Sequence, residues 1–297
     1  MIMIAFYLEY EYWFAATQLF LAMLGMGATL APKDFHEVIR EPKAVSIGIV
    51  MQLIIVPLIA LLLIITAGFP PAIIVGVALI AAIPGGTTSN VFVHLAKGNT
   101  PLSITITAIT TLACLLTTPY LLELLIAEYM PQNFIMPFAQ IAFEITVCLL
   151  VPLLLGMLVF RFSSHNAATF STWCVRLTLL VIVFIVLGSI GAGRLNLEIF
   201  GTDNLLRMIG FFLLLAIVAN LLPRVMGLNR EDRISIEMEV VVRNINLGLL
   251  LNVSLFPASN PTLAPIGNIV LFCLLLFGSL QMLLGAVLVG NGRRNKQ

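Results

Sequence analysis

The stretch Ile83-Pro84-Gly85-Gly86-Thr87-Thr88-Ser89-Asn90 interrupts a hydrophobic segment that runs from about residue 71 to residue 95. A Pro-Gly-Gly break removes backbone hydrogen bonds of a helix, and lipid offers no replacement for them. At membrane depth such a break is tolerated only inside protein or beside a water-filled cavity. The polar residues that follow it, Thr87, Ser89 and Asn90, carry neutral oxygens, which are ligands for hard cations. The stretch therefore predicts a transport site.

The composition is that of an integral membrane protein. Of 297 residues, 60% are hydrophobic and 10% are charged, and the mean hydropathy is +1.10, whereas soluble domains carry about 25% charged residues. A net charge of +1 gives no electrostatic basis for binding nucleic acid. The four cysteines lie in or at the ends of apolar segments without metal-ligand spacing, so we expect small core residues. They are Cys114, Cys148, Cys174 and Cys273.

The fold class that we expect is an all-α polytopic membrane protein with nine transmembrane helices. Nine segments approach the length of about 20 apolar residues that a spanning helix needs. They lie at about 13–31, 44–67, 71–96, 100–126, 135–161, 170–192, 204–223, 231–255 and 264–290. Because the connections are short, residues 1–297 are expected to form a single transporter domain.

The distribution of lysine and arginine predicts the orientation in the membrane. Cytoplasmic loops carry an excess of these residues. One set of loops and ends holds twelve of them, and the opposite set holds Arg194 and Arg207. We therefore expect the N-terminus outside and the C-terminus in the cytoplasm, and the compact loops fit a bacterial inner membrane. The twelve are Lys33, Arg40, Lys43, Lys97, Arg161, Arg176, Arg224, Arg230, Arg233, Arg293, Arg294 and Lys296.

Two unusual spans occupy corresponding places in the chain. The third span contains the break, and the eighth, at 231–255, carries several polar residues among apolar ones. Each is the penultimate span if the chain is divided into about 13–126 and 135–290. Transporters are often built from inverted repeats whose discontinuous helices meet at the midplane. We therefore expect two inverted five-helix repeats, the first lacking its first helix, with two discontinuous helices that cross.

The polar residues of the eighth span are Glu239, Arg243, Asn244 and Asn246. A charge at this depth costs roughly 2.5–3.5 kcal/mol on insertion scales, so intramembrane charges mark functional sites. Glu239 and Arg243 stand four residues apart and can pair if the backbone there is helical. One alternative is an ion pair that only locks two helices together. The neighbouring amides, which an ion pair does not need, favour a binding site.

Further oxygen ligands lie in neighbouring spans. Ser103 and Thr107 share one face of the fourth span, and Gln52 lies shortly before Pro57 in the second. Serine and threonine hydroxyls in such helices also bond to the preceding turn, which is the alternative for this face. Joined to one carboxylate, these oxygens predict a sodium site. Glu144 in the fifth span is either a titrating group, a partner for a cation or a helix-packing residue.

Several motifs together resemble the bile acid:sodium symporter family. They are MLGMGATLAPKDFHEVIREPKAV (23–45), QLIIVP (52–57), PGGTTSNVFVHLAKGN (84–99), LSITITAITTL (102–112) and EVVVRN (239–244). The resemblance covers roughly residues 16–290 and implies a transporter with a core domain and a panel domain. It also implies a first sodium site at Ser89, Asn90, Ser103, Thr107 and Glu239. The second would comprise Gln52, Glu239, Val240, Val242 and position 243.

Position 243 departs from the family, which usually has glutamine there. Arg243 carries only hydrogen-bond donors, so its side chain cannot ligate sodium. One hypothesis is that its charge replaces the second sodium and leaves one coupling ion. A second is that Arg243 neutralises Glu239 and makes the carrier independent of sodium. A third is that Arg243 contacts an anionic substrate.

The substrate implied by the resemblance is an organic anion, either a small organic acid or a bile-acid-like molecule. In the family Thr87 and Asn244 lie near the substrate, and both residues are present here. The last span lacks the asparagine that is usual in the family and reads IVLFCLLLFGSL. A bile acid itself is therefore less favoured than a smaller acid.

The function that we expect is secondary active transport: sodium-coupled uptake of an organic anion by alternating access. The alternative within transporters is a proton-coupled or sodium-independent carrier or exporter of the same fold. An intramembrane enzyme is disfavoured because the sequence has no HExxH motif, no paired intramembrane aspartates and no Ser/His pair at a suitable depth. A channel or receptor is disfavoured because two interrupted helices in matching places are typical of a carrier.

Overall fold

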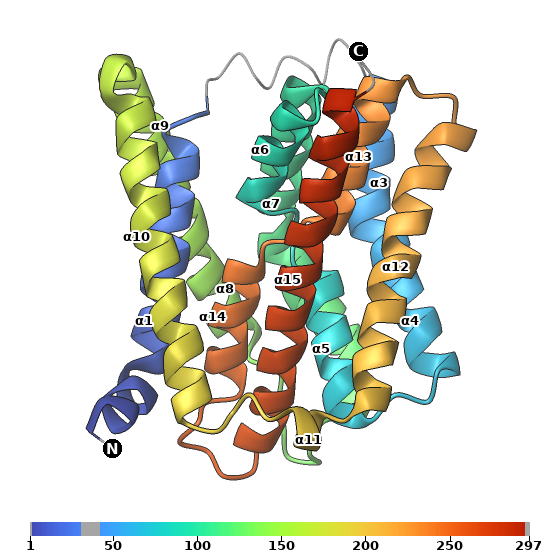
Figure 1. The fold of residues 1–297 in the computed structure, drawn as a ribbon. Helices are drawn as coiled ribbons and strands as arrows, with labels where there is room; N and C mark the ends of the chain where they lie inside the picture. Colours follow the sequence, from blue (N-terminus) through green and yellow to red (C-terminus); the bar gives the residue numbers. More distant parts are fainter. Residues whose placement is uncertain (1, 31–41, 295–297) are drawn as a thin grey trace.

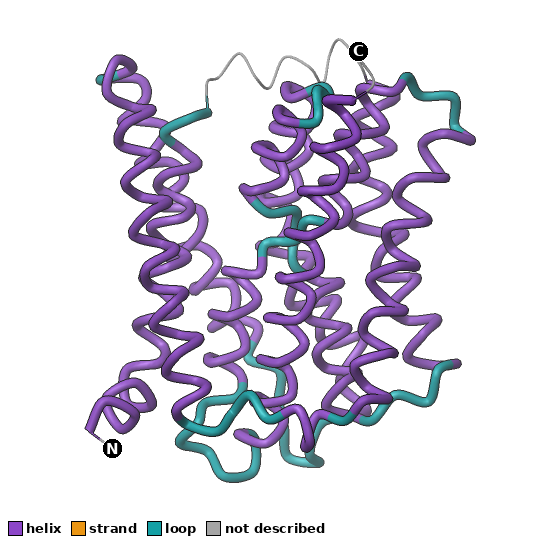
Figure 2. The backbone as a smooth tube through the Cα atoms, in the orientation of Figure 1, coloured by secondary structure: helices purple, strands orange, loops and turns teal. Residues whose placement is uncertain are grey.

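The computed structural model describes residues 2–30 and 42–294, and its regular elements over these ranges are helices plus one isolated backbone bridge (Figures 1 and 2). The predicted positions Lys33, Arg40 and Lys296 and the end of the span 13–31 lie outside the described residues. Six helices within the described residues are long and apolar enough to cross a membrane. They lie at Pro42–Thr66, Thr100–Tyr129, Phe138–Phe162, Ser164–Gly191, Thr202–Val225 and Ala264–Gly290. The chain is therefore a multi-pass, all-helical membrane protein.

Three long rods stand side by side at one edge of the molecule, where Figure 1 labels α1, α9 and α10. We call this group the three-helix layer. Its helix α1 packs along both of its neighbours. The elements of the layer are α1 (Ile2–Gly27), the continuous rod α8 (Phe138–Glu144), η4 (Ile145–Leu150) and α9 (Val151–Phe162), and α10 (Ser164–Gly191).

The remaining helices form a second group, which we call the crossing bundle. Its first elements are α3 (Pro42–Val50), η2 (Met51–Ile55), α4 (Val56–Thr66), α5 (Pro71–Ala82), α6 (Thr87–Leu95), α7 (Thr100–Ile126) and the short turn η3 (Ala127–Tyr129). Its later elements are α11 (Leu197–Phe200), α12 (Thr202–Val225), α13 (Arg230–Val241), α14 (Ile245–Leu255) and α15 (Ala264–Arg294).

The apolar periods in the sequence locate most of these helices to within a few residues, but α1 and α10 begin earlier than predicted, α10 at Ser164 instead of 170. Helix α1 begins at Ile2, well before the predicted start at 13, and has a kink at Tyr10 with φ −112° and ψ 15°. Apolar helices α5 and α14 are short, and each continues a partner across a break. Both interruptions lie in the spans where the sequence predicts them.

Two widened turns of π-helix precede prolines in otherwise regular rods. Proline has no N–H, and its ring clashes with the carbonyl four residues earlier, so the preceding turn loses a normal hydrogen bond. Before Pro57 the helix widens over Met51–Ile55, and Val56 N–H bonds to Met51 O. Before Pro152 it widens over Ile145–Leu150. The first of these turns carries Gln52, which is buried in the crossing bundle.

Candidate functional site

The two broken helices meet in the middle of the molecule, where Figure 2 shows loop segments surrounded by helices. Gly86 N donates to Val242 O at 2.7 Å, and Asn244 N donates to Pro84 O at 2.9 Å. These bonds form an antiparallel bridge between Gly85 and Arg243. Each break thus supplies one backbone acceptor to the other, which reduces the amount of unpaired backbone inside a membrane.

The two glycines of the break permit this close approach. A Cβ at Gly85 would lie 2.6 Å from Glu239 Oε2, and a Cβ at Gly86 would lie 2.8 Å from Arg243 O. Both distances are well below a normal carbon–oxygen contact, so neither position has room for a side chain. The predicted break at Pro84, Gly85 and Gly86 is therefore needed for the crossing as well as for ending α5.

Around Glu239 the structure brings together all five residues of the predicted first sodium site. Oε1 of Glu239 accepts from Ser89 Oγ at 2.5 Å and from Ser103 Oγ at 2.5 Å. Its Oε2 accepts from Thr107 Oγ1 at 2.8 Å. Asn90 Oδ1 lies 2.7 Å from Ser103 Oγ. Glu239, Ser89 and Ser103 are fully buried, so this cluster lies inside the crossing bundle.

This donor set fits a small hard cation. It offers one carboxylate, three hydroxyls and an amide oxygen, and such cations prefer oxygen ligands. Each hydroxyl has lone pairs as well as its proton, so it can turn from donating to the carboxylate to facing an ion. No group of three histidine, cysteine, aspartate or glutamate side chains with metal-binding geometry occurs in residues 2–30 and 42–294.

Glu239 and Arg243 do not pair directly. Helix α13 ends at Val241, and Val242 has φ −87° and ψ 88°, so the helical backbone that such a pair requires does not extend to Arg243. Gln52 lies between them instead: its Nε2 donates to Glu239 Oε2 at 3.3 Å, and its Oε1 accepts from Arg243 Nη1 at 3.2 Å. Its Oε1 also accepts from Gly85 N at 2.8 Å. The carboxylate thus remains directed at the three hydroxyls.

The guanidinium of Arg243 binds the carbonyl end of α5. Its Nε donates to Ile80 O at 3.2 Å, and its Nη2 donates to Ala81 O at 2.9 Å. The last carbonyls of a helix lack partners and carry partial negative charge, so they attract a cation. Of the other residues predicted for the second sodium site, Val240 and Val242 are buried, and Val242 O is bonded to Gly86 N.

One residue of the crossing is not predicted from the sequence. Gln281 of α15 is buried and bonds the backbone of Arg243 in both directions. Its Oε1 accepts from Arg243 N at 2.9 Å, and its Nε2 donates to Arg243 O at 3.3 Å. The signal that could have found it is its position as an amide within the apolar span 264–290.

A cavity of about 1010 Å³ lies between the three-helix layer and the crossing bundle. Thr87 at the start of α6 and Asn244 at the start of α14 both line it. Leucine, valine and isoleucine side chains of α10 and α15 line its walls, among them Leu179, Ile182 and Leu276. Arg243 borders the cavity too, but its guanidinium bonds point to α5 and Gln52.

Glu144 lies in a different interface. It is 3% exposed at the end of α8, and its Oε1 accepts from Ser254 Oγ of α14 at 2.6 Å and from Gln140 Nε2 at 3.2 Å. Its Oε2 is buried without a hydrogen-bond partner among the described residues. Of the roles considered from the sequence, the contact with Ser254 fits a residue that joins the two helix groups.

The chain has clear similarity to known transporters. It matches the model of the sodium bile acid symporter family over residues 16–197. It is 34% identical over 234 residues to the "Uncharacterized sodium-dependent transporter YocS" of Bacillus subtilis, which covers 77% of this chain and 70% of that protein. It is 30% identical over 200 residues to the "Sodium-dependent organic anion transporter" of Bos taurus, covering 66% of this chain and 52% of that one.

A plant relative extends the similarity through both broken helices. The chain is 26% identical over 280 residues to the "Probable sodium/metabolite cotransporter BASS1, chloroplastic" of Arabidopsis thaliana. That match covers 93% of this chain and 65% of the plant protein. These relatives are transporters rather than enzymes, and the motifs on which the resemblance rested fall within the matched lengths. The chain belongs to the sodium bile acid symporter family and is a membrane transporter.

Proposed function

We propose that the protein takes up an organic anion together with a single sodium ion by alternating access. The observation that carries this proposal is the buried carboxylate of Glu239. Three hydroxyls approach it within 2.8 Å, and no cationic side chain of the described residues contacts it directly. An unpaired carboxylate in a buried site needs a positive charge to offset its desolvation. A sodium ion held by Ser89, Asn90, Ser103, Thr107 and Glu239 supplies that charge.

Arg243 takes the electrostatic place of a second sodium. The carbonyl end of α5 offers it partial negative charge, as the ends of broken helices do for coupling ions in other carriers. A guanidinium there is permanently charged and covalently attached, so it can neither dissociate nor be transported. The protein would therefore transport one sodium ion in each cycle. Because Gln52 separates Arg243 from Glu239, this arrangement leaves the first site available for sodium.

The substrate that fits the cavity is an anion with an apolar body. The N-terminal ends of α6 and α14 carry partial positive charge, and Thr87, Thr88 and Asn244 add polar groups at the same place. Beyond them, α10 and α15 offer apolar walls. A volume of about 1010 Å³ lies at the upper end for ligand sites, which favours a body larger than that of the smallest organic acids.

In this proposal nine spans cross the membrane: six long helices, α1, and the broken pairs α5–α6 and α13–α14. The three-helix layer is the panel domain, and the crossing bundle is the core domain with both inverted-repeat crossings. The N-terminus faces outside and the C-terminus faces the cytoplasm of a bacterial cell. The charge asymmetry of the loops supports this orientation.

The alternative is a proton-coupled or sodium-independent carrier or exporter of the same fold. Glu144 is the observation that favours it, because a buried carboxyl oxygen without a partner among the described residues can bind a proton. In that case transport would follow a pH gradient and would survive the removal of sodium.

Reconstituted proteoliposomes distinguish these functions. We expect saturable uptake of organic anions when sodium is present outside, and loss of that uptake when potassium or choline replaces sodium. A thermal-shift screen of carboxylates of increasing apolar length, with and without sodium, identifies the substrate class. Uptake that continues without sodium and responds to an imposed pH gradient would favour the alternative.

A further inference from the structure

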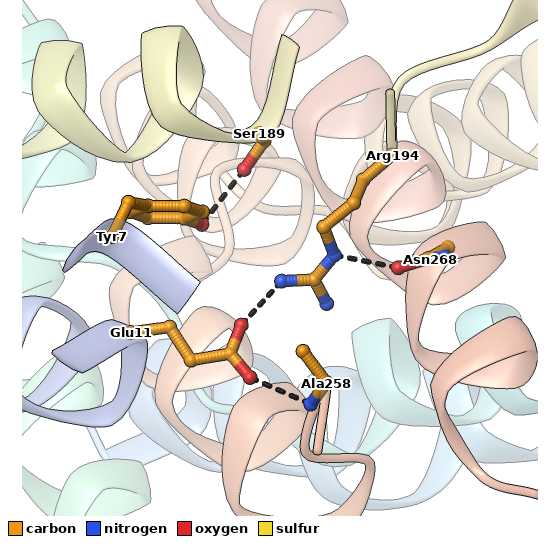
Figure 3. Close-up of polar contacts among 6 residues, drawn as sticks. All are labelled: Tyr7, Glu11, Ser189, Arg194, Ala258 and Asn268. Carbon is orange, nitrogen blue, oxygen red and sulfur yellow. Dashed lines mark hydrogen bonds and ion pairs between the residues drawn. The ribbon is translucent and has the colours of Figure 1, made fainter. Parts of the chain in front are cut away.

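Figure 3 shows a second polar cluster, which includes Glu11, Arg194 and Asn268 and shares no residue with the crossing. Arg194 Nη1 forms an ion pair with Glu11 Oε2, and both side chains are nearly inaccessible, at 4% and 6% exposure. Arg194 Nε also donates to Asn268 Oδ1 at 2.5 Å, and Glu11 Oε1 accepts from Ala258 N at 2.7 Å. Nothing in the proposed sodium or substrate site uses these groups.

Both charged partners belong to the three-helix layer. Glu11 lies in α1 directly after the kink at Tyr10, and Arg194 lies in the turn that ends α10, where its N–H bonds to Ser189 O at 3.0 Å. The two helices are held together beside the ion pair, because Tyr7 and Ser189 share a hydrogen bond of 2.8 Å. The pair is therefore internal to one group of helices.

The groups that this pair contacts belong to the crossing bundle. Ala258 follows α14, and Asn268 lies in the first turns of α15. The location is one end of the cavity: Leu195, which follows Arg194, and Phe272, one turn after Asn268, both line it. The bond from Ser254 to Glu144 also joins α14 to the three-helix layer. The layer therefore holds the segment from Ser254 to Asn268 at three points.

We propose that Glu11 and Arg194 are an interdomain gate that keeps this end of the cavity closed. The contacts between the three-helix layer and the crossing bundle must break here if the cavity opens to this side. This inference depends on the alternating access proposed above. Within this cluster, separation of the two helix groups breaks only the bonds from Glu11 to Ala258 N and from Arg194 to Asn268. The ion pair stays whole within the three-helix layer, and neither charge is left buried and unpaired.

Water compensates for the bonds that break. Nη2 of Arg194 is buried without a hydrogen-bond partner among the described residues, so opening would hydrate a donor that is unsatisfied in the closed state. Ala258 N–H and the Asn268 amide would likewise bond to water. The gate is thus closed by specific bonds but can open without a large electrostatic penalty.

A cysteine placed inside the cavity reports on the gate. Leu276 lines the cavity and lies on the same face of α15 as Asn268 and Phe272, eight and four residues earlier. In a Leu276→Cys background, a membrane-impermeant thiol reagent is applied separately to each face of the membrane, without substrate. The parent protein, whose four cysteines are buried, gives the background rate.

In the Leu276→Cys background, Asn268→Ala removes the bond to Arg194. We expect it to raise the rate at which the introduced cysteine is labelled from the membrane face nearer Arg194, which we call the Arg194 face, by about tenfold. This is the population shift that about 1.4 kcal/mol produces. Asn268→Asp adds a charge next to Arg194 and is expected to lower that rate. The matched control is Asn204→Ala, whose amide bonds Phe200 O within the crossing bundle and should leave the rate unchanged.

The two Asn268 variants make opposite predictions, so the test remains decisive if one of them fails to fold. The proposal would be overturned if Leu276→Cys alone and both Asn268 variants in that background were labelled at equal rates from the Arg194 face. It would also be overturned if Asn204→Ala gave the same increase as Asn268→Ala. Labelling needs neither sodium nor substrate. A sodium-independent carrier would therefore still show the gate, which separates failure of this inference from failure of the proposed function.

Discussion

At the level of single residues, Glu239 carries the proposed coupling. Its two carboxylate oxygens accept four hydrogen bonds, from Ser89, Ser103, Thr107 and Gln52. These neutral partners lower the cost of burying the charge without cancelling it. The charge therefore remains available to an ion, whereas a direct bond to Arg243 would have occupied it.

Replacing this carboxylate tests its role. Glu239→Gln keeps the shape but removes the negative charge, so we expect sodium-dependent uptake to fall more than about tenfold, or more than about 1.4 kcal/mol. Glu237→Gln is the matched control, because Glu237 is a buried carboxylate of the same helix that bonds Asn220 instead. Isotope uptake in proteoliposomes measures both. Equal losses in the two variants would point to a general effect on helix α13.

At the level of elements, the breaks between α5 and α6 and between α13 and α14 define the site. The bridge between Gly85 and Arg243 replaces two of the helical hydrogen bonds that the breaks give up. Half-helix ends then present carbonyls on one side, where Arg243 binds, and N–H groups on the other, where the cavity begins. Cation and anion sites thus share one crossing.

The close approach at the crossing predicts a large effect from one methyl group. Gly85→Ala would place a Cβ 2.6 Å from Glu239 Oε2, and overpacking of this kind costs about 1–3 kcal/mol. We expect loss of sodium-dependent uptake and a lower unfolding temperature. Gly210→Ala in α12 is the control: its Cβ meets nothing within 4 Å, and a helical alanine gains roughly 0.5–1 kcal/mol over glycine. A Gly85→Ala variant with normal uptake would contradict this packing.

Gln281 provides a second test of the crossing. Gln281→Leu keeps most of the side-chain volume but leaves the N–H of Arg243 without its partner, which costs about 1–3 kcal/mol. We expect a lower unfolding temperature in thermal denaturation. Ser279→Ala is the control on the same helix, because Ser279 Oγ bonds only to its own helix at Leu275 O in the described structure. A variant as stable as the wild type would show that the bond to Arg243 is dispensable.

The sequence predicts the helices and both breaks well, because apolar length and Pro-Gly-Gly are local signals. Residue type and the family motifs also predict one site from Ser89, Ser103, Thr107 and Glu239, whose side chains lie together in the structure. The sequence does not predict the position of Gln52 between two charges, since that depends on a π-helical turn and on the end of α13 at Val241. The sequence predicts Arg194 only as a loop charge and does not predict its ion pair with Glu11, because that pair joins residues 183 positions apart.

At the level of the whole molecule, a cavity lies between the three-helix layer and the crossing bundle. Glu239 and Arg243 lie within the crossing bundle, and the polar cluster of Glu11 and Arg194 lies at one end of the cavity. The three-helix layer contacts the crossing bundle mainly through α1 and α14, with additional contacts from α7 to α8 and η4. Movement of one group against the other would expose the crossing to alternate sides. Because Arg243 is bonded within the crossing bundle, its charge would move with that group and would not be exchanged with solvent.

The most direct test of this account is the number of sodium ions in a transport cycle. Simultaneous measurement of isotopic sodium and substrate uptake in proteoliposomes gives this ratio, and equilibrium binding gives the number of ions per protein. We predict one sodium ion for the wild type and two for Arg243→Gln, which exchanges the fixed cation for an oxygen ligand. Two sodium ions bound by the wild-type protein would contradict the replacement of the second ion by Arg243.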